Sequence, residues 1–169
     1  MIIRKEEPED FRAIYSVIKD AFDNAEHADG NEQDLVNALR QGEAFIPELS
    51  LVAEQDDKIV GHIMFTKAEV KNTTVLALAP LSVLPEYQGM GIGTALIKEG
   101  HKIAGKLGFG YSVVLGSNAY YTRTGYEPAD MFGIKPPFDV AKENFMAYRL
   151  RDDAPAIQGV LKYAREFGI

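Results

Sequence analysis

The chain has 169 residues, of which 46% are hydrophobic and 25% are charged, a composition typical of a soluble globular protein. Its net charge of -7 argues against a general nucleic-acid surface, because binding to a phosphate backbone relies on an excess of lysine and arginine. The absence of cysteine excludes disulfides, thiolate catalysis and cysteine-based zinc sites. The first residues lack the apolar run of a signal peptide, and no stretch approaches the length of a membrane span. We therefore expect a cytoplasmic protein with one domain over residues 1–169.

The first half of the sequence predicts a strand, two helices and a hairpin. A short strand over 2–4 precedes apolar residues that recur at helical spacing as far as Phe22. A second apolar stripe indicates a helix over 31–39. Strands over 50–55 and 58–66 follow, and the short polar segment between them is typical of a hairpin turn.

In the next segment, two apolar strands enclose a helix. The first strand covers 74–84 and is interrupted near Pro80, and the second covers 111–115. A helix between two apolar strands predicts a parallel pairing with a right-handed crossover. After the second strand we expect a very short helix, which Asn118 could cap and Gly125 could end.

The C-terminal part predicts a proline-rich loop over 133–140 and a strand over 144–150. The segment that follows is helical in composition, but we favour a strand around 160–163. The predicted fold class is therefore α/β (mixed α+β), with a central mixed sheet flanked by helices.

The segment "YQGMGIGTAL" places Gly89, Gly91 and Gly93 directly before a helix. Bare backbone at a helix start leaves N–H groups free for an anion, although tight strand-to-helix packing without a ligand is an alternative. A P-loop would need a lysine after its last glycine, and here Thr94 follows. The spacing and the late position in the chain also fit a dinucleotide-binding fingerprint poorly.

The segment "VLPEYQGMGIGTALI" resembles the acyl-CoA motif of the GNAT superfamily of N-acetyltransferases, Gln/Arg-x-x-Gly-x-Gly/Ala. Gln88, Gly91 and Gly93 occupy its fixed positions. The segment "AYYTRTGYEP" is similar to the family's late Tyr-x-x-x-Gly-Phe/Tyr signature, which is met here by Tyr121, Gly125 and Tyr126. The stretches "LGSNAYYTRTGYEPA" and "FGIKPPFD", together with "NFMAYRL", further resemble its YhbS-like branch, and the similarity is best from about 50 to 150.

The resemblance implies a V-shaped opening between the strands at 74–84 and 111–115, in which acetyl-CoA binds as cosubstrate. Backbone groups of the first strand would bind its pantetheine arm, as an added strand would, and the glycine loop would bind the pyrophosphate. Lys98 and Lys102 could reach the phosphates, but a solvated helix face is the more common role for such a row. The cofactor-binding residues that the resemblance implies are Leu81, Ser82, Val83, Gln88, Gly89, Met90, Gly91, Ile92, Gly93, Thr94, Asn118 and Tyr121.

The implied reaction is direct acetyl transfer from the thioester to an amine, which needs a base, an oxyanion donor and an acid for the thiolate. Tyr121 matches the family's general acid, with Tyr120 as the alternative, and a backbone N–H near Ser82 or Val83 would bind the oxyanion. For the base the candidates are Glu54, His62 and a water relay, with Glu54 preferred to His62. No cluster of His, Asp and Glu has metal-ligand spacing, so we expect no metal.

The predicted function is transfer of an acetyl group to a primary amine of a small molecule or protein. The alternative is a CoA-binding sensor or interaction protein with little turnover. A dehydrogenase or nucleotide triphosphatase is a distant third hypothesis. We expect no nucleic-acid or membrane partner. The family often forms homodimers, but nothing in this sequence demands one.

Overall fold

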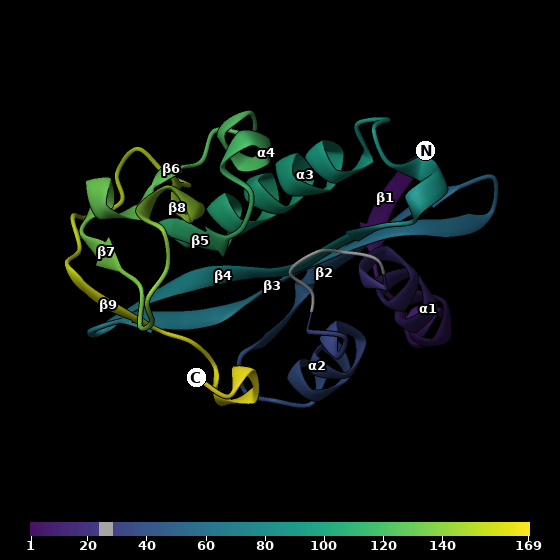
Figure 1. Ribbon diagram of the computed structural model, residues 1–169, viewed down its shortest axis with the longest axis horizontal. Coiled ribbons are helices and arrows are strands. Elements are labelled where there is room, and N and C mark those ends of the chain that lie inside the picture. Colours follow the sequence, from purple (N-terminus) through teal and green to yellow (C-terminus); the bar gives the residue numbers. More distant parts are fainter. Residues whose placement is uncertain (24–28) are drawn as a thin grey trace.

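The computed structural model describes residues 1–23 and 29–169. Its central feature is a mixed sheet with helices on both faces (Figure 1), and the strands follow the order β1-β2-β3-β4-β5-β8-β6. Only β4 and β5 pair in parallel along this path, and the other neighbours are antiparallel. The predicted fold class, with two parallel strands inside a mostly antiparallel sheet, is confirmed.

The elements follow the predicted order, except that two short strands, β6 and β7, were not predicted, and the hairpin strands are longer than expected. The strands are β1 (Ile2–Lys5), β2 (Phe45–Gln55), β3 (Lys58–Val70), β4 (Thr73–Val83), β5 (Tyr111–Leu115), β6 (Glu127–Pro128), β7 (Ile134–Lys135), β8 (Phe145–Arg149) and β9 (Gly159–Lys162). The helices are α1 (Phe11–Phe22), α2 (Glu32–Arg40), α3 (Ile92–Lys106) and α4 (Asn118–Thr122). Short 3₁₀ turns lie at Pro8–Asp10, Pro85–Tyr87, Ala129–Phe132, Lys142–Asn144 and Arg165–Phe167.

Helix α3 lies on one face of the sheet and α1 and α2 lie on the other (Figure 1). Gly100 of α3 has no side chain where the ring of Phe65 from β3 lies, so the helix packs closely on the central strand. On the opposite face, Ile14 and Ile18 of α1 are fully buried, as the helical spacing of apolar residues predicts. The sheet thus separates the side of the molecule with α3 from the side with α1 and α2.

Strand β4 does not end at Pro80. It continues to Val83, and its pairing with β3 shifts register between Leu78 and Leu81, so that β4 bulges around the proline. Since proline has no N–H to donate to the ladder, the irregularity falls where the sequence predicts an interruption.

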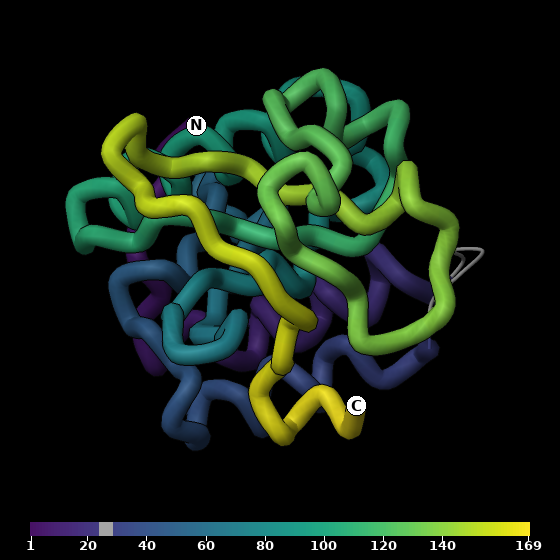
Figure 2. Tube along the Cα trace, turned by 90° about the vertical axis from the view of Figure 1, so that its left-hand side faces the viewer, coloured from purple at the N-terminus to yellow at the C-terminus, as the bar shows by residue number. Residues whose placement is uncertain are grey.

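The C-terminal segment closes the end of the sheet away from β1. Strand β9 pairs with both β3 and β7. Figure 2 shows this yellow segment running across its end of the molecule to the C-terminus, where Phe167 and Ala164 pack against the main core. The ambiguous segment therefore contains a strand, as favoured. Among the described residues, no helix has both the length and the apolar character needed to cross a membrane.

Candidate active site

The glycine loop turns the chain from the end of β4 into α3. Gly89 and Gly91 have φ angles of +79° and +84°, which side-chain-bearing residues rarely adopt. Gly91 directly precedes the helix, so this left-handed residue sets the direction in which the first helical N–H groups point. Within the described chain, no atom lies within 4 Å of a Cβ built on either residue. The loop is therefore bare toward open space at these two positions, whereas at Gly93 the Tyr120 hydroxyl lies where a side chain would begin, so close packing accounts for the third glycine.

A cavity of about 540 Å³ lies beside this loop. It is bounded by the end of β4, the glycine loop, the first turn of α3 and the helix α4 with the residue after it. Its lining residues are Leu81, Val83, Tyr87, Gln88, Gly89, Gly91, Ile92, Gly93, Thr94, Tyr120, Tyr121 and Arg123. The cavity thus brings together two sequence motifs that lie about thirty residues apart.

The V-shaped opening is visible in the strand pairing. Strands β4 and β5 pair at Leu76 with Ser112 and at Ala77 with Val113, and β4 then continues alone on this side to Val83. The Leu84 N–H donates to the Val60 carbonyl at 2.9 Å. Because backbone groups alternate in an antiparallel ladder, this bond directs the N–H and C=O groups of Leu81 and Val83 away from β3, toward the opening.

A hydrogen bond from Gln88 supports this direction of the Val83 backbone groups. Its side-chain amide donates to the Val83 carbonyl at 3.0 Å, so that carbonyl points away from β3. The same alternation turns the Ser82 N–H toward β3. Of the two predicted oxyanion donors, Val83 is the one whose N–H faces the opening.

Helix α4 holds two tyrosines at the cavity. Its first turn is capped by Ser117, whose hydroxyl accepts the Tyr120 N–H at 3.3 Å. At its other end the N–H groups of Gly125 and Tyr126 donate to the carbonyls of Thr122 and Tyr121, with Gly125 at φ +97°. This is the pattern of a Schellman motif, and it explains the glycine of the late signature.

The two tyrosine rings are perpendicular, with centroids 5.0 Å apart. Tyr120 reaches across to α3, because its hydroxyl occupies the place where a side chain of Gly93 would begin. Tyr121 lies against Gly116, and burial raises the pKa of its phenol well above the ordinary value. Tyr121 is therefore protonated at neutral pH and able to donate. Successive residues of a helix point about 100° apart, which predicts that only one of the two tyrosines faces the site, but the structure brings both to the cavity.

Some predicted cofactor residues lie outside the lining of this cavity. Asn118 does not cap α4, since Ser117 does, and its amide donates instead to the Glu143 carbonyl at 3.0 Å. Ser82 is buried, and its position opposite His62 in the ladder directs its side chain away from Leu81 and the cavity. Met90 is 64% exposed at the tip of the loop.

Glu54 lies apart from the tyrosines. It lines a separate cavity of about 440 Å³ next to α1, and its carboxylate forms an ion pair with Arg4 at 3.3 Å. Among the described residues, that cavity and the cavity at the glycine loop have no lining residue in common. The structure therefore does not bring Glu54 to Tyr121.

His62 is fully buried in a polar cluster, formed with Glu6, Ser50 and Arg40, on the side of the sheet that faces α1 and α2. Glu6 accepts hydrogen bonds from Ser50 at 2.6 Å and Arg40 at 2.7 Å, and His62 Nε2 lies 3.2 Å from its carboxylate. Burial alone raises the pKa of Glu6, but the hydrogen bonds from His62, Arg40 and Ser50 outweigh it and hold the pKa at about 2. Burial lowers the pKa of His62, so the imidazole is neutral and its Nε2–H faces Glu6.

The sequence analysis missed Tyr87 and Arg123, which also line the cavity at the glycine loop. The guanidinium of Arg123 lies 5.6 Å from the ring centroid of Tyr120. An anionic ligand in an acidic chain needs cationic side chains close to it. The position of Arg123, two residues after Tyr121, could therefore have indicated in the sequence that it lines the site. Lys98 and Lys102 are exposed and do not line this cavity.

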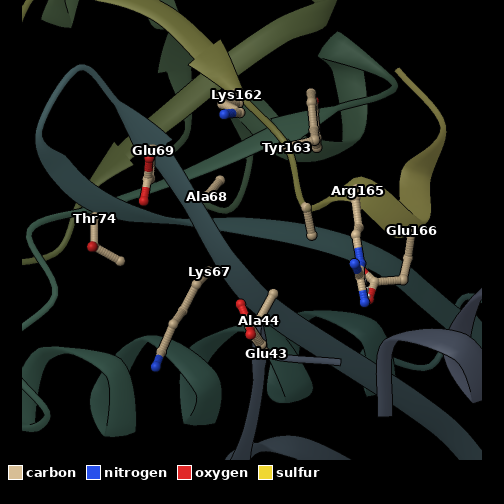
Figure 3. A pocket seen from close by; sticks show the side chains of 11 residues that line it. Glu43, Ala44, Lys67, Ala68, Glu69, Thr74, Lys162, Tyr163, Arg165 and Glu166 are labelled. Atoms are coloured by element: carbon tan, nitrogen blue, oxygen red, sulfur yellow. Dashed lines mark ion pairs between the residues drawn. The ribbon is translucent and has the colours of Figure 1, made fainter. Parts of the chain in front are cut away.

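A further cavity, of about 390 Å³, lies at the edge of β3 beside the C-terminal segment (Figure 3). Lysine and arginine side chains alternate with carboxylates around it, and Arg165 pairs with Glu166 at 3.9 Å. In the described parts of the chain, none of its lining residues belongs to either sequence motif. It is thus separate from the site at the glycine loop. Nor do His, Asp and Glu side chains of residues 1–23 and 29–169 form a group of three that could hold a metal ion.

Residues 11–126 match the model of the acetyltransferase (GNAT) family. The chain belongs to the GNAT family. Among known GNAT relatives, it is 30% identical over 171 residues to the uncharacterized N-acetyltransferase YhbS of Escherichia coli K12, covering 99% of this chain and 98% of YhbS. A second relative, the uncharacterized N-acetyltransferase YjhQ of the same strain, is 42% identical over 118 residues, covering 67% of this chain and 65% of YjhQ.

Two solved GNAT structures share this architecture. YhbS from Escherichia coli in complex with CoA matches with a TM-score of 0.89 and 28% identity, covering 99% of this chain and 92% of that one. A GNAT acetyltransferase from Brucella melitensis in complex with acetyl-CoA matches with a TM-score of 0.81 and 34% identity, covering 98% and 97%. The GNAT chain described here is therefore an N-acetyltransferase at the level of its family.

Proposed function

We propose that acetyl-CoA occupies the cavity between β4 and the glycine loop, and that its acetyl group passes directly to a primary amine of a small molecule or protein. One observation carries this proposal: the freed edge of β4, the bare glycine loop and Tyr121 all line one cavity. The complexes of YhbS with CoA and of the Brucella enzyme with acetyl-CoA support the same cosubstrate.

The pyrophosphate would lie over the N–H groups of the glycine loop and the first turn of α3. Left-handed Gly89 and Gly91 leave that approach open, and the helix dipole favours an anion there. Arg123 at the edge of the cavity supplies a positive charge. This local site explains how a chain of net charge -7 binds a polyanionic cosubstrate.

The pantetheine arm would pair with Leu81 and Val83 as an added strand. The N–H of Val83 would bind the oxygen of the tetrahedral intermediate, and the carbonyl of Val83 would exchange its bond with Gln88 for one with the cosubstrate. Tyr121 would donate its proton to the departing thiolate, and the raised pKa of its phenol keeps that proton available at neutral pH.

We propose that water carries away the proton of the attacking ammonium. Glu54 is engaged by Arg4 next to another cavity, and His62 is enclosed with Glu6 and Ser50. Neither carboxylate nor imidazole lines the cavity with Tyr121. The class of acceptor, a primary amine of a small molecule or protein, stays a prediction from the sequence. A homodimer and a cytoplasmic location likewise stay predictions.

The proposal is tested by incubating the protein with acetyl-CoA and a broad panel of primary amines, with free thiol as the readout. We expect at least one amine to accelerate thiol release and to appear as its acetamide. Tight CoA binding without turnover on any amine would favour the sensor alternative.

With an accepted amine in hand, Tyr121→Phe tests the acid. Loss of a general acid typically costs about 10²- to 10⁴-fold in rate, so we expect kcat to fall in that range with little change in the KM for acetyl-CoA. Tyr120→Phe is the matched control, and a larger loss of kcat in that variant than in Tyr121→Phe would transfer the acid role to Tyr120.

A further inference from the structure

The hydroxyl of Tyr126 is buried where three elements meet. Its oxygen lies 2.8 Å from the Ser112 hydroxyl on β5 and 3.0 Å from His101 Nε2 on α3. Tyr126 is 1% exposed and does not line the cavity at the glycine loop. The sequence analysis assigned no role to His101, and the proposed acetyl transfer uses none of these three side chains.

Burial shifts the pKa values of the tyrosine and the histidine of this cluster in opposite directions. Burial raises the pKa of the Tyr126 phenol and lowers the pKa of His101 to about 4. At neutral pH a protonated phenol therefore faces a neutral imidazole. Either Tyr126 donates to His101 Nε2 and accepts from Ser112, or it accepts from His101 Nε2–H and donates to Ser112, and in both arrangements the buried hydroxyl makes two hydrogen bonds.

Two contacts connect Tyr126 to Tyr121. Their rings pack edge to face with centroids 5.6 Å apart, and the Tyr126 N–H donates to the Tyr121 carbonyl at 3.2 Å. The end of α4 is held from the same side: the ring of Tyr148 occupies the place where a side chain of Gly125 would begin, and it stacks on His101 with centroids 4.1 Å apart. Tyr121 thus packs on the ring of Tyr126, and His101 contacts that ring both through its hydroxyl and through Tyr148.

We propose that His101 and Ser112, through the hydroxyl of Tyr126, position the ring of Tyr121 for acetyl transfer. They are positioning residues, since they act through Tyr126. Helix α3 then has two roles, because its first turn borders the proposed cofactor site and its third turn holds the ring behind the acid. This inference rests on the proposed function of Tyr121. A displacement of a reacting group by about 1 Å can cost on the order of a hundredfold in rate.

The test compares Tyr126→Phe in the wild-type protein and in Tyr121→Phe, measuring kcat and KM. We expect Tyr126→Phe to lower kcat about tenfold with the KM for acetyl-CoA unchanged, and to have no further effect when Tyr121 is already Phe. An equal loss in both backgrounds would overturn the proposal. Ser112→Ala, which removes one of the two bonds, is expected to give a smaller loss of the same kind.

Tyr111→Phe is the matched control. Its phenol donates to the Pro155 carbonyl at 2.9 Å, in a hydrophobic cluster that includes Val113 and Phe145 and is separate from the core around Tyr126. Tyr111→Phe therefore also removes the hydrogen bond of a buried tyrosine, without contact to Tyr121. We expect comparable thermal destabilisation and an unchanged kcat. If kcat falls equally in Tyr111→Phe, the effect of Tyr126→Phe comes from a general loss of stability, and the positioning proposal is overturned.

A second measurement separates this inference from the acid role of Tyr121. In protein with ¹³C-labelled tyrosine rings, the Tyr121 ring resonances should shift in Tyr126→Phe and stay in place in Tyr111→Phe. If they shift while Tyr121→Phe retains full activity, the positioning stands and the acid role falls. Unmoved resonances in Tyr126→Phe would overturn the positioning and leave the acid role intact.

Discussion

Replacing Gly93 by alanine should weaken acetyl-CoA binding without destabilising the fold. Gly93 is the second residue of α3, where alanine is favoured over glycine by at most about 1 kcal/mol, the value for a helix interior. The added methyl group would overlap the hydroxyl of Tyr120, while Leu81 at 3.6 Å is an ordinary contact. Tyr120 must therefore rotate, which disturbs its perpendicular contact with Tyr121, a contact type worth about 0.5–1.5 kcal/mol. The two effects nearly cancel in the free energy of unfolding.

The displaced ring and the new methyl group take space from the cavity of about 540 Å³. We expect the Kd for acetyl-CoA, measured by titration calorimetry, to rise about tenfold, equivalent to about 1.4 kcal/mol. Gly105→Ala is the matched control in the same helix, since its nearest neighbour is the Leu150 carbonyl at 3.5 Å and no cavity residue is touched. An unchanged Kd in Gly93→Ala, or an equal rise in Gly105→Ala, would refute the assignment of this cavity to the cofactor.

Two predictions concern the stability of the fold. Gly91→Ala should cost about 1–2 kcal/mol of stability in urea unfolding, because the φ of +84° is strained for alanine; a cost below that of Gly105→Ala would contradict the argument. Glu6→Gln should cost about 3–5 kcal/mol, because Arg40 loses its buried partner at 2.7 Å. The pKa of Glu6 falls from 4.5 to about 2 on folding, so its stabilisation is complete above pH 4.5 and is lost as the pH falls toward 2. Over that range the free energy of unfolding of Glu6→Gln should depend less on pH than that of the wild type, and parallel curves would exclude the Glu6 carboxylate as the cause.

Local motifs made much of the site predictable. The spacing of Gln88, Gly91 and Gly93 lies within one loop, and the Schellman motif after Tyr121 depends on a glycine four residues later. Both could be recognised because the backbone geometry that they require is set by neighbours in sequence. The succession of strand β4, helix α3 and strand β5 is also contiguous in the sequence, so the parallel pairing of β4 with β5 could be predicted.

Features that depend on register or on distant partners were not predictable. Ser82 faces α1 because of its pairing with His62, and a shift of one residue would have turned it to the cavity. Glu54 is held by Arg4, fifty residues earlier in the chain. The cluster of His101, Ser112 and Tyr126 joins α3, β5 and the turn after α4, which come together only in the folded chain.

A crystal structure of the protein with CoA tests the central claim most directly. We predict the pyrophosphate over the N–H groups of the glycine loop, the pantetheine arm along Leu81 and Val83, and the sulfur within hydrogen-bonding distance of the Tyr121 hydroxyl. CoA bound in the cavity of Figure 3, or with its sulfur away from Tyr121, would contradict the account.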